Sequence, residues 1–145
     1  MSPLISLLYV SEANHMLPEG ENPVEGIVEV ALSRNPKLDV TGALVFTGPH
    51  FAQVLEGPKA GVDELLTSIR RDPRHRNMHV VQAVEIAERE FPYWSLAYAG
   101  PSLYVDRHLR PLVEWRATGS GEEGMQAQRL IKMMRAFAQE QKRTA

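Results

Sequence analysis

The sequence predicts an α+β fold with a ferredoxin-like order of elements, β-α-β-β-α-β-β, in which two helices cover one face of a single sheet. Three observations predict it. Several short segments are rich in β-branched and aromatic residues, two segments repeat apolar residues at helical spacing, and the two kinds of segment follow one another in this order over residues 1–100. Compared with the basic ferredoxin-like unit, the order contains one added strand.

The first strand and the first helix are predicted in the first quarter of the chain. Leu4 to Val10 is an apolar run without charge or proline, typical of a strand that is buried on both faces. After a loop of turn-forming and charged residues, Pro23 occupies the position at which proline opens a helix, and Pro36 ends that helix just after Asn35. The apolar face of this helix is expected to contain Val24, Ile27, Val28, Ala31 and Leu32.

A hairpin and the second helix follow. The β-rich runs Val40 to Thr47 and Phe51 to Leu55 are separated by Gly-Pro-His, which predicts a short turn and places Gln53 in the middle of a strand. The pairs Gly57-Pro58 and Asp72-Pro73 bound the next segment, whose apolar residues recur at helical spacing. These residues are Val62, Leu65, Leu66 and Ile69.

Two last strands and a C-terminal extension complete the prediction. The strands are expected at Met78 to Ile86 and at Trp94 to Ala99, so that residues 1–100 form one domain. Residues 101–145 are interpreted as an extension that begins with a segment of mixed character and becomes helical from Gln126 to Gln141. An apolar stripe on this helix predicts docking on the free face of the sheet or on a second protomer. The stripe contains Ala127, Leu130, Ile131, Met134 and Ala138.

Composition narrows the classes of function. A net charge of -2, from 16 basic and 18 acidic residues, indicates neither nucleic-acid binding nor attachment to an anionic membrane. Without cysteine the chain cannot form disulfides, thiolate metal sites or a cysteine adduct with a flavin, and no metal site is predicted. The apolar N-terminal run is much shorter than the roughly 20 residues of a membrane span. We therefore expect a cytoplasmic protein whose partner is a protein or a small molecule.

Three polar residues are candidates for a binding site. Gln53 lies within an apolar strand, and a buried amide there must find partners for its donors and its acceptor. Each of the three also has an ordinary structural explanation. Gln53 could face solvent, Tyr9 could be a core phenol, and Asn35 could be a helix stop. A ligand bound between the two helices would meet all three side chains.

Five sequence blocks resemble, in order and in spacing, the signature blocks of the BLUF family of blue-light sensors, over about the first 100 residues. The blocks are Leu8-Tyr9-Val10-Ser11, Asn35 with Val40-Thr41-Gly42-Ala43-Leu44, Phe51-Ala52-Gln53-Val54-Leu55-Glu56-Gly57, Arg71-Asp72-Pro73-Arg74-His75 and Phe91-Pro92-Tyr93-Trp94-Ser95. The resemblance implies a blue-light photoreceptor that binds FAD, or FMN, non-covalently between the two helices. The residues that it implies around the flavin are Tyr9, Arg34, Asn35, Gln53, Asp72, Arg74 and His75.

The resemblance also assigns roles within this set. Asn35 would bind the pyrimidine edge of the ring, Arg34 would lie near the ring or the phosphate tail, and Arg74 is the arginine expected after the second helix. Light would drive proton-coupled electron transfer from Tyr9 to the flavin, with Gln53 relaying the proton. Gln53, rotated or tautomerised, would then donate a new hydrogen bond to the flavin C4 carbonyl and shift the absorption reversibly to the red.

Signal transmission is expected through Trp94, which the family pairs with a methionine two residues later. This chain has Leu96 there, which is nearly isosteric with methionine but lacks the thioether. We expect this difference to affect signal transmission and to leave the photochemistry intact. The residues after Gly100 are too few for an ordinary catalytic or DNA-binding output domain. We therefore expect no enzymatic activity and a signal passed by contacts with an effector protein or within a homo-oligomer.

Two alternatives remain open from the sequence. A flavin-free structural or dimerisation module would keep the fold without the pigment, and Leu96 is the feature that favours it. A small acyl-phosphate hydrolase of ferredoxin-like fold would also use an arginine and an asparagine. However, the acidic loop at residues 12–22 has no glycine-rich segment that could bind phosphate, which makes the hydrolase the weaker alternative.

Overall fold

The computed structural model describes residues 3–14, 23–100, 102–114 and 123–144. The strands in this part of the chain are β1 (Leu4–Ala13), β2 (Thr41–Phe46), β3 (His50–Pro58), β4 (His75–Ile86) and β5 (Trp94–Ala99). The helices are α1 (Pro23–Arg34), α2 (Lys59–Arg70), α3 (Leu103–Glu114) and α4 (Glu123–Thr144), with a short 3₁₀ helix, Pro36–Leu38, after α1.

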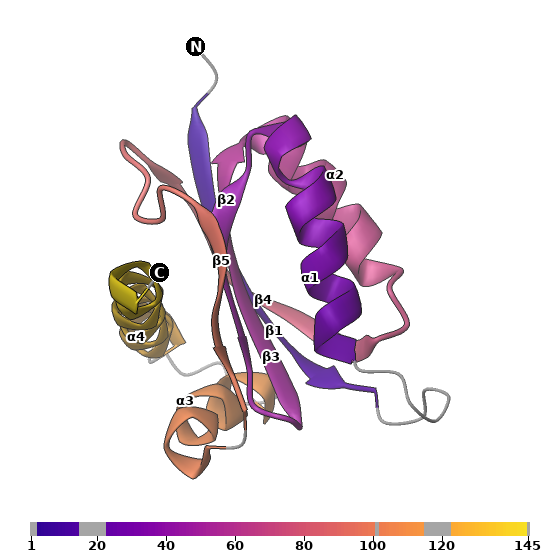
Figure 1. The fold of residues 1–145 in the computed structure, drawn as a ribbon, viewed down its shortest axis with the longest axis vertical. Helices are drawn as coiled ribbons and strands as arrows, with labels where there is room; N and C mark the ends of the chain where they lie inside the picture. The colour runs from indigo at the N-terminus through magenta and orange to yellow at the C-terminus, as the bar shows by residue number, and fades with distance from the viewer. Residues whose placement is uncertain (1–2, 15–22, 101, 115–122, 145) are drawn as a thin grey trace.

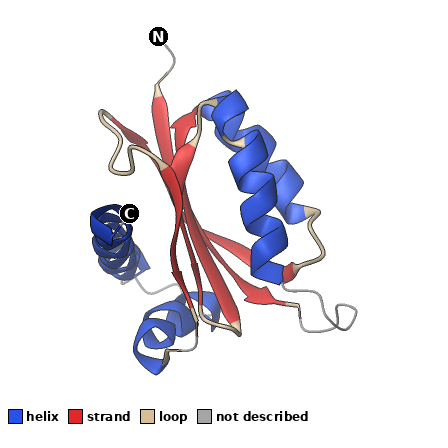
Figure 2. Ribbon diagram, viewed as in Figure 1, coloured by secondary structure: helices blue, strands red, loops and turns tan. Residues whose placement is uncertain are grey.

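The strands form one five-stranded sheet in the order β4-β1-β3-β2-β5, antiparallel except for the parallel pair of β2 and β5. The helices α1 and α2 cover one face of this sheet, and α3 and α4 lie on the other, as Figure 1 and Figure 2 show. The predicted ferredoxin-like α+β fold is confirmed. No helix in the described part of the chain is long and apolar enough to cross a membrane.

The two faces of the central strands pack against different helices, because successive strand residues point to opposite sides. Tyr9 of β1 shares a core cluster with Leu65 of α2, whereas its neighbour Leu8 packs with Leu109 of α3. Burial on both sides explains why residues 4–10 of β1 are mostly apolar instead of alternating, and why β3 is buried from Phe51 to Gly57, including its polar residues Gln53 and Glu56. Phe51, Gln53 and Leu55 of β3 face α1 and α2.

The strands β3 and β4 are longer than predicted. β3 continues past Leu55 to Pro58, and β4 begins at His75 instead of Met78. Both extensions pair with β1, which is bonded to a neighbour on each side along most of its length. Pairing with a central strand therefore overrides the local turn signal of Gly57-Pro58.

Two helical segments differ from the prediction. Leu32, expected on the sheet-facing side of α1, is 60% exposed. At 3.6 residues per turn it lies about 80° round the helix from Val24, beyond the stripe that reaches the sheet. The segment 101–115, expected to be of mixed character, contains the helix α3. Its buried residues recur at helical spacing, but Pro111 interrupts the pattern in the sequence, since proline is disfavoured inside helices. These buried residues are Val105, Leu109 and Leu112.

The C-terminal helices bury the second face of the sheet. Ala127, Leu130 and Met134 of α4 are fully buried, and α4 contacts β5, β2 and β4. The apolar stripe predicted on this helix thus packs on the free face of its own sheet, which is the first of the two partners expected for it. A single core cluster joins the sheet, α3 and α4.

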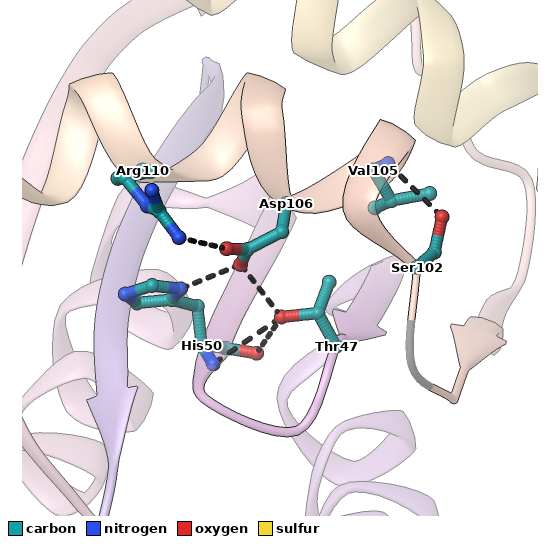
Figure 3. Close-up of polar contacts among 6 residues, drawn as sticks. All are labelled: Thr47, His50, Ser102, Val105, Asp106 and Arg110. Carbon is teal, nitrogen blue, oxygen red and sulfur yellow. Dashed lines mark hydrogen bonds and ion pairs between the residues drawn. The ribbon is translucent and has the colours of Figure 1, made fainter.

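A buried carboxylate connects α3 with the turn between β2 and β3 (Figure 3). Asp106 Oδ1 lies 2.6 Å from His50 Nδ1 and accepts a hydrogen bond of 3.0 Å from the Thr47 hydroxyl. The other oxygen lies 3.5 Å from the guanidinium of Arg110, which is largely exposed. Because hydrophobic packing has no directional preference, these polar contacts fix the position of α3 on the sheet.

Replacing Asp106 with alanine should lower the free energy of unfolding by about 1–3 kcal/mol, because the Thr47 hydroxyl and the His50 ring lose their buried acceptor. Arg110→Ala is the matched control, since an exposed ion pair contributes at most about 1 kcal/mol. Urea unfolding of the parent and the two variants measures both effects. If Asp106→Ala were as stable as the parent, packing alone would hold α3 in place.

Candidate functional site

A cavity of about 490 Å³ lies between α1 and α2, on the face of the sheet to which Gln53 points. Its volume falls within the range of roughly 300–1,000 Å³ that is usual for small-molecule sites. The two helices and the segment after α2 form its walls, and β3 lies at its floor. The described residues that line it are Ile27, Val30, Ala31, Arg34, Asn35, Gln53, Leu65, Ser68, Ile69, Arg71, Asp72, Pro73 and Arg74.

The Gln53 side chain connects β3 with two other strands. It is 2% exposed, and the register of β1 and β3 pairs it directly with Tyr9. Gln53 Nε2 donates a hydrogen bond of 2.6 Å to the Tyr9 hydroxyl, and Gln53 Oε1 accepts one of 2.9 Å from Trp94 Nε1. An indole N–H can only donate, so Trp94 requires the amide oxygen on its side and leaves the nitrogen for Tyr9. Trp94 therefore sets the orientation of the Gln53 amide.

Tyr9 lies behind Gln53 and outside the cavity wall. Burial raises the pKa of its phenol above the ordinary value, because the phenolate would lose its hydration. The hydrogen bond from Gln53 lowers this pKa in part, and the charge of Asp72 raises it further. Tyr9 is therefore neutral at physiological pH, and its proton is released only after another change in the phenol, such as the loss of an electron.

Asn35 lies at the end of α1 with one polar atom unpaired. Its backbone carbonyl accepts the N–H groups of Leu38 and Val40, at 3.1 and 3.0 Å, which shapes the turn from α1 into β2. The side chain is 2% exposed and lines the cavity, yet its Nδ2 has no hydrogen-bond partner among the described residues. A buried amide donor without a partner costs about 1–3 kcal/mol. Asn35 Nδ2 is therefore suited to an acceptor oxygen on a bound ligand.

Charged side chains form part of the cavity wall. Arg74 forms an ion pair of 2.9 Å with Asp72. The Arg74 guanidinium lies against Gly26 of α1, where a Cβ would come within 2.5 Å of Arg74 Nε. With Arg34 and Arg71, three arginines and one aspartate line the cavity. This excess of positive charge suits a ligand that has phosphate groups.

His75, also expected beside a ligand, lies outside the cavity wall. It begins β4 and is 7% exposed. Its ring nitrogens lie 2.8 Å from the Ser11 hydroxyl and 2.7 Å from the Ile69 carbonyl, so that the ring connects β1 with the last turn of α2. Its ring centroid is 5.9 Å from that of Tyr9. His75 thus packs beneath the site together with Tyr9.

Several wall residues are not among those predicted. Ser68 accepts a hydrogen bond from Arg34 and so connects α2 with α1. Arg71, next to the predicted Asp72, also lines the cavity. Helical periodicity identifies the apolar positions of both helices but does not separate those that face a cavity from those that face the core. The apolar wall residues include Ile27, Leu65 and Ile69.

Leu96 lies in the same transverse row of the sheet as Gln53. The register pairs Tyr9 with Gln53, Gln53 with Leu44, and Leu44 with Leu96. Trp94 is two residues before Leu96 on β5, and both pack against the core cluster that contains Leu44. Leu44 therefore lies between Gln53 and Leu96 in this row, whereas Trp94 of β5 contacts the Gln53 amide directly.

The cavity fits the cofactor that the resemblance implies. Apolar side chains from both helices suit a flat aromatic ring, the unpaired amide of Asn35 suits a ring carbonyl, and the arginines suit phosphate groups. FAD and FMN contain all three parts. The described residues therefore provide the donor set that a flavin requires.

Comparison with known proteins leads to the same family. The model for the sensors of blue light using FAD, the BLUF domain, matches residues 4–97. The chain is 37% identical over 99 residues to subunit beta of the photoactivated adenylate cyclase of Euglena longa, which is 68% of this chain and 11% of that protein. It is 41% identical over 75 residues to the blue light- and temperature-regulated antirepressor BluF of Escherichia coli (strain K12), which is 52% of this chain and 18% of that protein. The chain thus spans only a small part of the length of these curated relatives.

Solved structures share the fold. The dark-state structure of the BLUF protein BlrB has a TM-score of 0.63 at 31% identity, with 90% of this chain and 96% of that chain covered. Klebsiella pneumoniae BlrP1 with FMN and cyclic diGMP has a TM-score of 0.61 at 28% identity, with 93% and 35% covered. The photoactivated state of BlsA, at 19% identity and a TM-score of 0.65, shows the shared fold alone, with 91% and 94% covered. The family match over residues 4–97 and these likenesses show that the chain belongs to the BLUF family, as a flavin-binding photoreceptor for blue light that uses FAD.

Proposed function

We propose that Tyr9 and Gln53 carry out the photochemical step of this sensor and that Trp94 passes its result toward the C-terminal helices. The observation that carries the proposal is the continuous hydrogen-bonded path from the Tyr9 hydroxyl through the Gln53 amide to the Trp94 indole. FAD, when bound, would supply the absorption of blue light and accept both the electron and the relayed proton. Asn35 and the charged wall residues are proposed to hold it, and FMN, which has the same ring, would meet the same groups. The charged residues are Arg34, Arg71, Asp72 and Arg74.

Tyr9 is the source of the electron and of the proton. Its phenol is neutral before illumination, because burial raises its pKa. Loss of an electron makes a phenol strongly acidic, and a buried cation would be costly, so the proton leaves together with the electron. Gln53 is the neighbour at 2.6 Å that takes part in this transfer. Since the amide nitrogen faces Tyr9, receiving the proton requires the amide to rotate or to change tautomer.

Rotation of the Gln53 amide is coupled to Trp94. When the amide oxygen turns to the Tyr9 side, the NH₂ group faces the indole N–H, and two donors meet. The hydrogen bond of 2.9 Å to Trp94 must then break. Trp94 begins β5, and β5 is followed by α3, so the change reaches the strand that precedes the C-terminal helices. This route does not require a thioether at position 96, where the chain has Leu96.

The output is proposed to be a change of protein contacts, without an enzymatic activity of this chain. In this proposal residues 1–100 are the flavin-binding domain and residues 101–145 are the output extension, which now packs on the sheet through α4. The name of the antirepressor relative supports a protein effector, and we propose that this effector and the chain are cytoplasmic. The apolar face of α4 would also fit a second protomer, so that release from the sheet would favour a homo-oligomer.

Blue light should change both the flavin spectrum and the protection of α4. Illumination of the flavin-loaded protein is expected to give a small red shift that reverses in darkness, with faster hydrogen exchange over residues 126–140 while the shift lasts. Size-exclusion chromatography under the same two conditions reports the oligomer. Absence of the red shift would contradict the photochemical proposal, whereas a normal red shift with unchanged exchange of α4 would contradict the output proposal.

A further inference from the structure

Glu56 is a buried carboxylate on β3, outside the flavin cavity. It lies three residues after Gln53 and points to the opposite face of the sheet, where it is 1% exposed. Its Oε1 accepts two hydrogen bonds of 2.8 Å, from the backbone N–H groups of Glu90 and Phe91 in the segment between β4 and β5. Phe91 is itself 2% exposed and belongs to the core cluster of α3 and α4.

The burial of Glu56 makes these hydrogen bonds necessary. Desolvation raises the pKa of the Glu56 carboxyl, and the N–H groups of Phe91 and Glu90, with the charge of Arg89, lower it in part. A buried carboxylate without partners is costly, so the segment must stay in place for Glu56 to remain satisfied. The two hydrogen bonds therefore fix the backbone of Glu90 and Phe91 as well as the Glu56 side chain.

Arg89 strengthens the same attachment. Its Nη1 donates to the Glu56 backbone carbonyl and to the Thr41 hydroxyl, each at 2.7 Å. Its Nη2 donates to the Asp39 carbonyl at 2.8 Å. Residues 89–91 are thus bonded to Glu56 in two ways. The backbone N–H groups of Glu90 and Phe91 donate to its carboxylate, and the Arg89 side chain donates to its main-chain carbonyl.

The segment that Glu56 holds leads directly to Trp94. Two residues separate Phe91 from Trp94, and the Gly42 N–H donates to the Tyr93 carbonyl at 3.2 Å. β5 is an edge strand that pairs with β2 on one side only, and the Trp94 side chain is half-buried. Because packing surrounds the indole incompletely, its position depends on where the backbone before it is held.

We propose that Glu56 is a positioning residue of this photoreceptor, whose carboxylate holds the segment before β5 so that the Trp94 N–H meets the Gln53 oxygen. The inference rests on the proposed function of Gln53, since Trp94 sets the orientation of that amide. Both residues belong to β3: Gln53 binds the Trp94 indole on one face of the sheet, and Glu56 binds the segment before β5 on the other. Without the Glu56 acceptor, the indole leaves Gln53 more often and the amide loses its fixed orientation.

The test uses Trp94 as its own probe. The chain has two tryptophans, and Trp115→Phe leaves Trp94 as the single one. In this background Glu56→Ala removes the acceptor, whereas Glu56→Gln keeps a carbonyl oxygen for both N–H groups. Glu90→Ala is the matched control, because it removes a partly exposed carboxylate from the same segment. Acrylamide quenching of Trp94 fluorescence, in the flavin-loaded protein in darkness, is the first readout, and light-minus-dark absorption is the second.

In Glu56→Ala the acrylamide quenching of Trp94 should rise about fivefold, because the loss of one net hydrogen bond increases the population of the exposed indole by about that factor. The light-induced red shift should decrease in the same variant. Glu56→Gln and Glu90→Ala should match the Trp115→Phe protein. A purely structural role would lower the melting temperature and leave both readouts unchanged. Equal quenching in Glu56→Ala and Glu56→Gln would overturn the inference.

A second variant and a second outcome complete the test. If Glu56→Ala does not fold, Glu56→Met keeps the side-chain volume without a strong acceptor and has the same expected results. A parent protein without a red shift would contradict the roles of Tyr9 and Gln53, but the quenching of Trp94 in darkness would still test Glu56. Failure of the inference and failure of the proposed function therefore give different results.

Discussion

A Gln53→Leu variant should bind flavin and show no reversible red shift in blue light. Leucine is close to glutamine in volume but neither donates nor accepts a hydrogen bond, so the path between Tyr9 and Trp94 is interrupted at its centre. The buried Tyr9 hydroxyl also loses its partner, which should lower the free energy of unfolding by about 1–3 kcal/mol. Light-minus-dark absorption at equal flavin occupancy measures the first effect, and urea unfolding measures the second.

Gln82→Leu is the matched control for this substitution. Gln82 lies on β4, paired with Leu8, and forms an exposed hydrogen bond of 3.3 Å with Gln128. Its removal leaves the cavity unchanged, so the variant should keep the full red shift. A reversible shift of parental amplitude in Gln53→Leu would show that the amide is not the switching group.

A Tyr9→Phe variant should lose the red shift for a different reason. Phenylalanine keeps the ring, whose centroid is 5.9 Å from that of His75, but has no hydroxyl proton and is much harder to oxidise. Gln53 keeps its hydrogen bond to Trp94, so the amide orientation and the dark spectrum should resemble those of the parent more closely than in Gln53→Leu. The fluorescence of the bound flavin should also increase, because the electron donor that quenches it is gone.

The same absorption and fluorescence measurements on Tyr98→Phe provide the control for Tyr9→Phe. Tyr98 lies on β5, where its ring packs against Phe137 of α4 at 5.2 Å between centroids. Loss of its hydroxyl should leave the red shift and the flavin fluorescence at parental levels. If Tyr9→Phe retained the parental response, another residue would have to supply the electron.

Most elements could be predicted because local periodicity and breakers define them. The strand expected at Trp94 to Ala99 has those bounds in the structure, and Pro23 opens α1. The predicted bounds were wrong where strand pairing or tertiary packing overrides the local turn or helix-breaking residues. Pairing with β1 carries β3 through Gly57-Pro58, and the interior Pro111 conceals the helical spacing of α3.

For the site, the sequence alone determined the order of elements, the exclusion of cysteine chemistry, and the polar residues Tyr9, Asn35 and Gln53 that match the family. Tertiary structure decided that Tyr9 lies behind Gln53, that Trp94 orients the Gln53 amide, and that Glu56 holds the segment before Trp94. The physical reason is sequence distance. Periodicity describes residues a few positions apart, whereas these hydrogen bonds join residues 34 to 44 positions apart, whose proximity depends on which strands become neighbours.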